Sequence, residues 1–216
     1  MTGIQRWPDG RLASARDQTA SVLLKVLDER GDDLRRHLRH VSRLAHAVAG
    51  PLGLGEERAE ILGRAALFHD IGKVAIPDEI LNKPGPLDQA EWHVMRGHTV
   101  IGERILAAAP SLLPMALVVR SCHERWDGGG YPDGLQGHRI PFESRLIFLC
   151  DAYDAMTSDR PYRDAVPRAE ALEELRRCGG TQFDPVLTEA VCDTIEGWSA
   201  EERAQVASTE LLAVPA

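Results

Sequence analysis

Apolar residues recur every three or four positions along most of the chain, a spacing that predicts amphipathic helices. In the stretch 33–49, for example, Val41, Leu44 and Ala45 share one helical face and basic residues occupy the other. Alternating patterns typical of strands are essentially absent. The sequence therefore predicts an all-α fold of about seven to eight helices. They are expected at about 14–29, 33–49, 56–69, 88–109, 114–124, 143–158, 168–178 and 184–198.

One segment interrupts this pattern. Residues 126–141 are rich in glycine, contain two prolines and show no periodicity, which predicts a long functional loop. The remaining pattern indicates a single helical domain over 14–198, because 216 residues suffice for one substantial core. Residues 1–13 are predicted to form a flexible N-terminus and 199–216 a C-terminal tail.

Composition places the chain among soluble globular proteins. Hydrophobic residues make up 44% and charged residues 27%, and no apolar stretch is long enough to span a membrane. The chain opens without a signal-peptide pattern. Its cysteines lack CxxC spacing, so reduced thiols and a cytoplasmic location are expected.

The formal net charge of −8 limits the kinds of partner that the protein can bind. It argues against binding of a nucleic-acid polymer, which needs a basic surface. An anionic substrate would have to be met by local cations, either metal ions or clustered arginines.

The strongest chemical signal is the pair His69-Asp70, at the end of an apolar helical run. An imidazole can ligate one cation, and a carboxylate can bridge two. Lys73 then adds positive charge beside an anionic substrate. Taken singly, the other candidate ligands could equally be packing or surface residues. These are His37, His98, His123 and Asp151.

Several motifs in the expected order resemble the HD-GYP phosphodiesterases, a branch of the HD superfamily. Together these motifs cover about residues 30–195. They lie at 67–76 (LFHDIGKVAI), 81–87 (LNKPGPL), Gly97-His98 with Gly102, 123–132 (HERWDGGGYP), 134–135, 140–141, 151–155 (DAYDA), 160–163 (RPYR) and 183–185 (FDP).

The resemblance implies a polynuclear metal site. Two divalent ions are expected, iron or manganese, with Asp70 as the bridge and Lys73 as a donor to the phosphate. Asp33, four residues before His37, would be a possible carboxylate ligand of a third ion. The implied ligands are His37, His69, Asp70, His98, His123 and Asp151. The remaining histidines are interpreted as non-ligands. They are His40, His46, His93 and His138. Of these, His40 lies close enough to His37 to reach the site.

The resemblance also implies a substrate, cyclic di-GMP, hydrolysed to pGpG, GMP or both. Arg160 and Arg163 would hold its phosphates by bidentate donation. The loop residues Gly130, Tyr131 and Pro132 would surround the substrate and a partner surface, with Tyr131 offering an aromatic face. Partners to consider are a cyclase domain, a sensor or receiver domain and a second copy of the chain.

One position departs from the family pattern. Where relatives carry two adjacent histidines, this chain has Cys122-His123. Cys122 is either a thiolate ligand, which would favour zinc, or an inert buried thiol. The departure leaves open a module that binds cyclic di-GMP or a cyclase domain without turnover. A second rival, an HD phosphohydrolase acting on another nucleotide, is disfavoured by the intact GYP loop.

Overall fold

The computed structural model describes residues 9–29, 31–159 and 164–208. Within these ranges the elements are helical, and β-pairing is limited to one isolated bridge between Gly179 and Phe183. The all-α prediction is confirmed. The elements in chain order are α1 (Asp9–Asp28), α2 (Asp32–Ala49), α3 (Glu56–Phe68), η1 (Ile71–Ala75), α4 (Asp78–Leu81), α5 (Gln89–Arg96), α6 (His98–Ala107), α7 (Leu113–Arg120), η2 (Gly137–Arg139), α8 (Phe142–Thr157), α9 (Arg168–Arg177), α10 (Pro185–Gly197) and α11 (Ala200–Ala207).

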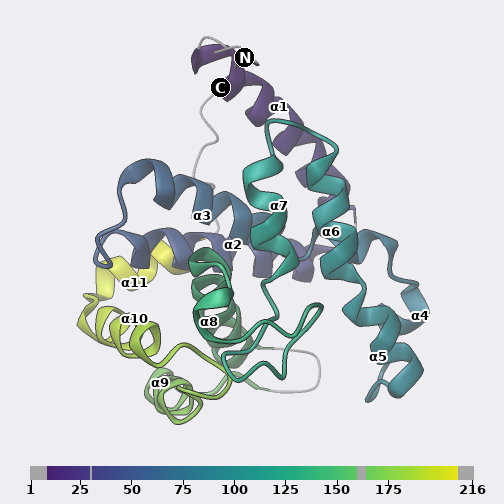
Figure 1. Ribbon diagram of the computed structural model, residues 1–216. Helices are drawn as coiled ribbons and strands as arrows, with labels where there is room; N and C mark the ends of the chain where they lie inside the picture. Colours follow the sequence, from purple (N-terminus) through teal and green to yellow (C-terminus); the bar gives the residue numbers. More distant parts are fainter. Residues whose placement is uncertain (1–8, 30, 160–163, 209–216) are drawn as a thin grey trace.

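Helices α2 and α3 lie side by side across the middle of the molecule (Figure 1). The apolar positions of α2 that share a face, including Val41, Leu44 and Val48, are fully buried. Helix α8 packs against both α2 and α3, and α9 to α11 gather at one end of the pair. This arrangement buries one continuous core, which supports the residues of α2, α3 and α8 that carry candidate chemistry.

The end of α3 is joined to the start of α6 by an unusually close contact. The 3₁₀-helix η1 packs directly on α6, and a Cβ added at Gly72 would lie 1.8 Å from the carbonyl oxygen of His98. Only glycine allows two backbones to approach in this way. The contact therefore fixes the position of His98 relative to the His69-Asp70 turn.

The long loop between α7 and α8 is tied to the rest of the fold through its backbone. The amides of Trp126 and Asp127 donate to the carbonyls of Gln182 and Thr181, at 3.1 and 2.9 Å. Buried Glu124 accepts hydrogen bonds from two further loop amides. The segment predicted as a loop is therefore ordered by hydrogen bonds rather than by regular structure.

Four boundaries differ from the sequence prediction, one of them the end of the helix expected over 114–124, which lies at Arg120. The helix expected over 88–109 is two helices separated at Gly97, where the chain turns so that α6 can pack on η1. Helix α1 begins at Asp9 rather than near residue 14. The predicted tail contains α11, whose Val206 packs on the core and accepts a hydrogen bond from Arg43 at its carbonyl. The predicted capping box of Asp88 and Glu91 is present.

Within the described ranges, none of the helices combines the length and the apolar character needed to cross a bilayer.

Candidate metal centre

The His69-Asp70 pair sits in the turn that ends α3. Both side chains are buried, at 1% exposure. The Nδ1 of His69 lies 2.7 Å from the carbonyl oxygen of Ala66. A carbonyl only accepts, so Nδ1 carries the proton, and the lone pair of His69 is on Nε2. The helix end thus presents one imidazole nitrogen and one carboxylate to the same point.

His98, the first residue of α6, is oriented in the same manner. Its Nδ1 lies 2.7 Å from the carbonyl oxygen of Met95, which leaves Nε2 as the lone-pair nitrogen. That Nε2 is 3.3 Å from Oδ1 of Asp70, and the Nε2 of His123 is 3.8 Å from the same oxygen. The Nε2 of His69 is 3.6 Å from the other oxygen, Oδ2. Three imidazoles from different elements therefore converge on one carboxylate.

These convergent atoms are buried without hydrogen-bond partners among the described residues. They are His69 Nε2, Asp70 Oδ1, His98 Nε2 and His123 Nε2. Leaving a buried polar atom unsatisfied costs about 1–3 kcal/mol, and four in one place call for a common explanation. A bound cation explains all four, because each atom can donate a lone pair.

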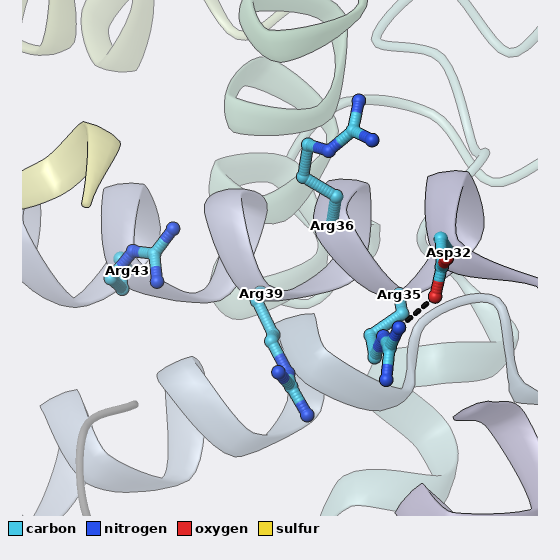
Figure 2. Close-up of a pocket in the computed structure, with 5 residues that line it drawn as sticks. All are labelled: Asp32, Arg35, Arg36, Arg39 and Arg43. Carbon is cyan, nitrogen blue, oxygen red and sulfur yellow. Dashed lines mark hydrogen bonds and ion pairs between the residues drawn. The ribbon is translucent and has the colours of Figure 1, made fainter. Parts of the chain in front are cut away.

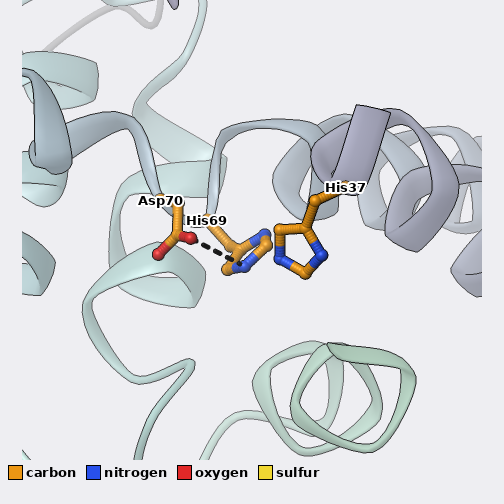
Figure 3. Close-up of side chains that lie close together, drawn as sticks. All are labelled: His37, His69 and Asp70. Carbon is orange, nitrogen blue, oxygen red and sulfur yellow. Dashed lines mark ion pairs between the residues drawn. The ribbon is translucent and has the colours of Figure 1, made fainter. Parts of the chain in front are cut away.

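The ligand atoms form two overlapping groups with Asp70 in common. One group is His37, His69 and Asp70, and the other is Asp70, His98 and His123. Within each group the ligand atoms lie within 4.8 Å of one another. Figure 3 shows the first group, with His37 reaching from α2 towards the turn that carries His69 and Asp70. Each group offers two imidazoles and one carboxylate, a donor set that suits divalent iron, manganese or zinc.

His37 is held by two aspartates of α8. Its Nε2 lies 3.2 Å from Oδ1 of Asp151, and its Nδ1 lies 2.5 Å from Oδ2 of Asp154. Burial lowers the pKa of His37, but the hydrogen bonds to the two carboxylates outweigh burial and raise that pKa to about 9. Asp151 is also 3.9 Å from Nε2 of His69, so it lies at the edge of the first group.

The carboxylates of the centre are anionic despite their burial. Burial alone would raise the pKa of Asp70, but the charge of Lys73 and the adjacent imidazoles hold that pKa well below its usual range. The Nζ of Lys73 is 2.5 Å from Oδ2 of Asp70, and its side chain is partly exposed. Lys73 therefore holds an ammonium group at the edge of the centre.

Three predicted ligands belong to neither group: Asp151, which lies only at the edge of the first, and Asp33 and Cys122. Asp33 is exposed, with 80% of its side chain accessible, and pairs with Arg36 at 3.2 Å. The Cys122 thiol is buried and donates to the carbonyl oxygen of Val118 at 3.1 Å. Burial raises the pKa of Cys122 well above its usual value, so the sulfur is a protonated thiol. The geometry thus agrees with the inert-thiol alternative.

The GYP loop covers the second group. The ring of Tyr131 stacks on His123, with centroids 5.3 Å apart and planes at 20°. The guanidinium of Arg96 lies over the Tyr131 ring, 5.4 Å from its centroid. A Cβ at Gly130 would lie 2.2 Å from the backbone nitrogen of Arg125. The loop can therefore pack this close to the backbone of Arg125 only because residue 130 is glycine. The predicted phosphate ligands Arg160 and Arg163 lie outside the described residues.

The sequence indicates that His40 could reach the site, but it does not single out Asp154 or Glu124. In the sequence Asp154 stands out only as part of a motif, although its position three residues after Asp151 places both on one helical face, and in the structure it contacts His37. His40, interpreted as a non-ligand, contacts the second carboxylate oxygen of Asp154. Buried Glu124 accepts hydrogen bonds from the amides of Asp133 and Leu135, at 2.7 and 3.0 Å. No spacing in the sequence indicates the role of Glu124.

Comparison with known proteins assigns the chain to a family. The sequence model described as "HD domain" matches residues 21–187. The chain belongs to the HD domain family. The relatives that follow confirm the resemblance to its HD-GYP branch.

Two curated relatives illustrate the match. The cyclic di-GMP phosphodiesterase response regulator RpfG of Xanthomonas campestris is 40% identical over 176 residues, covering 81% of this chain and 47% of that protein. The 3′3′-cGAMP-specific phosphodiesterase 2 of Vibrio cholerae is 36% identical over 178 residues, covering 82% of this chain and 34% of that protein. The chain thus spans about half or less of the length of these relatives.

A solved structure shows the same fold. The HD domain of the L. monocytogenes phosphodiesterase PgpH, in complex with cyclic di-AMP, superimposes with a TM-score of 0.60. The alignment covers 88% of this chain and 98% of that one, at 18% sequence identity.

Proposed function

We propose that this chain is the catalytic domain of a metal-dependent phosphodiesterase that hydrolyses cyclic di-GMP to pGpG, GMP or both. The observation that carries the proposal is the position of Asp70, shared by two groups of buried ligand atoms that lack partners among the described residues. A carboxylate between two cation sites is the arrangement used for phosphodiester hydrolysis. The printed activities of the curated relatives support the same reaction class.

We propose two divalent ions, iron or manganese, as the cofactors. His37 and His69 would hold one, His98 and His123 the other, with Asp70 between them and Asp151 beside the first. When bound, the ions neutralise phosphate oxygens and lower the pKa of water. The exposure of Asp33 and its pairing with Arg36 do not support a third ion there. The Cys122 thiol donates to a helix carbonyl and lies outside both groups, so it gives no specific reason to expect zinc.

The chain's own residues would bind and orient the substrate. Lys73, held by Asp70 at 2.5 Å, presents an ammonium group that can donate to a phosphate oxygen as negative charge builds up. Tyr131 covers His123 and offers its ring at the edge of the site, where a nucleobase could stack. Phosphate contacts by Arg160 and Arg163 rest on the sequence alone. Docking of a cyclase, sensor or receiver domain, and homodimer formation, likewise stay predictions.

The module without turnover is not favoured, because the curated relatives are named as phosphodiesterases. A second substrate deserves a direct test, because relatives of comparable identity are named for 3′3′-cGAMP.

The test is hydrolysis by the chain purified anaerobically, with metal content measured on the same sample. We expect two ions per chain and turnover of cyclic di-GMP to linear products separated by chromatography. An Asp70→Asn variant serves as the inactive control, and 3′3′-cGAMP is assayed in parallel. Faster turnover of 3′3′-cGAMP would reassign the substrate. A chain carrying two ions that hydrolyses neither dinucleotide would contradict the proposal and favour a binding module.

A further inference from the structure

Helix α5 carries an aromatic and basic surface beside the metal centre. None of the eight residues of α5 is buried, and Trp92 is 44% exposed. The guanidinium of Arg96 lies 5.8 Å from the centroid of the Trp92 ring and 5.4 Å from that of Tyr131. The Tyr131 ring in turn stacks on His123 of the second ligand group, 5.3 Å away. Trp92, Arg96 and Tyr131 therefore form a continuous row that leads from the surface to that group.

Arg96 lacks the counter-charge that other arginines of the fold carry. On α2, for example, Arg35 pairs with the neighbouring Asp32, and Figure 2 shows the arginine side chains of this helix spreading to both of its sides. On α5 the acidic Glu91 is paired with Lys83, whose Nζ lies 2.5 Å from its Oε2. Among the described residues, the guanidinium of Arg96 contacts the two rings and pairs with no carboxylate. Its N–H donors are thus available to a ligand.

The Trp92 ring has surface on which a further planar group can stack. A cation–π contact extends to about 6 Å, so the guanidinium at 5.8 Å lies at the outer limit of this contact, and much of the indole stays exposed. A nucleobase stacked on the indole would lie beside the guanidinium, within reach of its paired N–H groups. Arginine recognises guanine by donating to O6 and N7, whereas adenine presents an amino group in place of O6. A phosphate group would gain nothing from the exposed indole, which favours a base as the ligand.

We propose that Trp92 and Arg96 form a guanine-binding subsite next to the metal centre, in which Trp92 stacks on the base and Arg96 donates to O6 and N7. The subsite presupposes the proposed function, in which a guanine nucleotide is bound through its phosphate at the metals. Its base then extends away from the metals, and the row from Tyr131 to Trp92 offers planar groups next to the second ligand group. Adenine nucleotides are disfavoured, because their amino group would face the N–H donors of Arg96.

The test compares GMP with AMP as probes, by titration calorimetry on the metal-loaded full chain. The two nucleotides share ribose and phosphate, so the ratio of their dissociation constants reports on the base. We expect GMP to bind at least about fivefold more tightly than AMP, and this preference to disappear in Arg96→Met. Arg104→Met removes the charge of another exposed arginine, on α6, and is the matched control that keeps the preference. Trp92→Ala should weaken both nucleotides at least about fivefold, whereas Trp92→Phe should retain most of the affinity.

Three outcomes would overturn the subsite. Equal affinities of the wild-type chain for GMP and AMP would show that guanine is not recognised. Equal weakening of both nucleotides in Arg96→Met would assign Arg96 to the phosphate instead. Unchanged affinities in Trp92→Ala would show that the base does not stack on the indole.

Hydrolysis of cyclic di-GMP, assayed on the same samples, separates the subsite from the proposed function. A chain that prefers GMP through Arg96 but hydrolyses no dinucleotide would keep the subsite and contradict the proposed function. A chain that hydrolyses cyclic di-GMP without preferring GMP to AMP would contradict the subsite alone.

Discussion

Replacing Asp70 with asparagine tests the central feature of the site, the sharing of one carboxylate by two ligand groups. The change keeps the shape of the side chain and one acceptor for Lys73, which lies 2.5 Å from Oδ2. It removes a full negative charge, because the low pKa of Asp70 keeps it ionised at neutral pH. Both groups lose a ligand at once, and each is left with two imidazoles.

The size of the effect follows from this shared position. Changing a residue that only supports a metal ligand lowers metal affinity about 10- to 100-fold. Loss of a direct anionic ligand should therefore cost each ion at least about 100-fold, or roughly 2.8 kcal/mol. Hydrolysis should fall at least about a thousandfold, since removing even one donor to a developing charge costs about 100- to 1,000-fold.

The assay is metal content after dialysis against a weak chelator, with hydrolysis and circular dichroism on the same samples. His123→Ala is the matched control, because His123 belongs to the second group alone. We expect about two ions for wild type, one for His123→Ala and fewer than one for Asp70→Asn. An Asp70→Asn protein that keeps both ions, or loses no more than His123→Ala does, would refute the shared-ligand geometry.

Three further variants test the remaining features. Cys122→Ala should leave the metal content and the rate of hydrolysis unchanged. Its free energy of unfolding, measured by urea denaturation, should fall by about 1 kcal/mol because less apolar surface is buried. A reduced metal content would show that the thiol is a ligand. Gly72→Ala should unfold the protein or strip its metal, because its Cβ would lie 1.8 Å from a carbonyl oxygen. Gly63→Ala is the control: the nearest atom to its Cβ would be 3.6 Å away, so thermal melts should show a normally folded protein. Metal binding must displace the proton of His37, whose pKa is about 9. Affinity measured by calorimetry should therefore rise up to about tenfold per pH unit from pH 7, level off above pH 9 and lose this slope in His37→Gln.

Periodicity predicted most of the fold because the helices are amphipathic around one core. The break at Gly97 escaped prediction because it depends on the contact between Gly72 and the backbone of His98, 26 positions later in the chain. Helix α11 was missed for a different reason. Ser199 and Glu202 form a capping box that the sequence displays, but the polar segment after it looked like a tail.

The candidate site shows what spacing does and does not determine. Asp33 and Asp154 both lie one helical turn from a predicted ligand, yet Asp33 faces solvent and Asp154 contacts His37. Spacing places a residue on a helical face, but the neighbouring element decides whether that face is buried. For Asp154 the neighbour is α2, which supplies His37 and His40.

The two ligand groups are positioned by different structural means. His37 and His69 come from α2 and the end of α3, so the packing of these two helices sets the first group. The second group depends on two glycine contacts: a Cβ at Gly72 would meet the carbonyl oxygen of His98 at 1.8 Å, and one at Gly130 would meet that of His123 at 2.6 Å. Both histidines of this group are therefore located through their own backbones by glycines of the family motifs. A methyl group at Gly130 should displace His123 and leave the first group in place, because its nearest contacts are with the backbone of His123, Glu124 and Arg125.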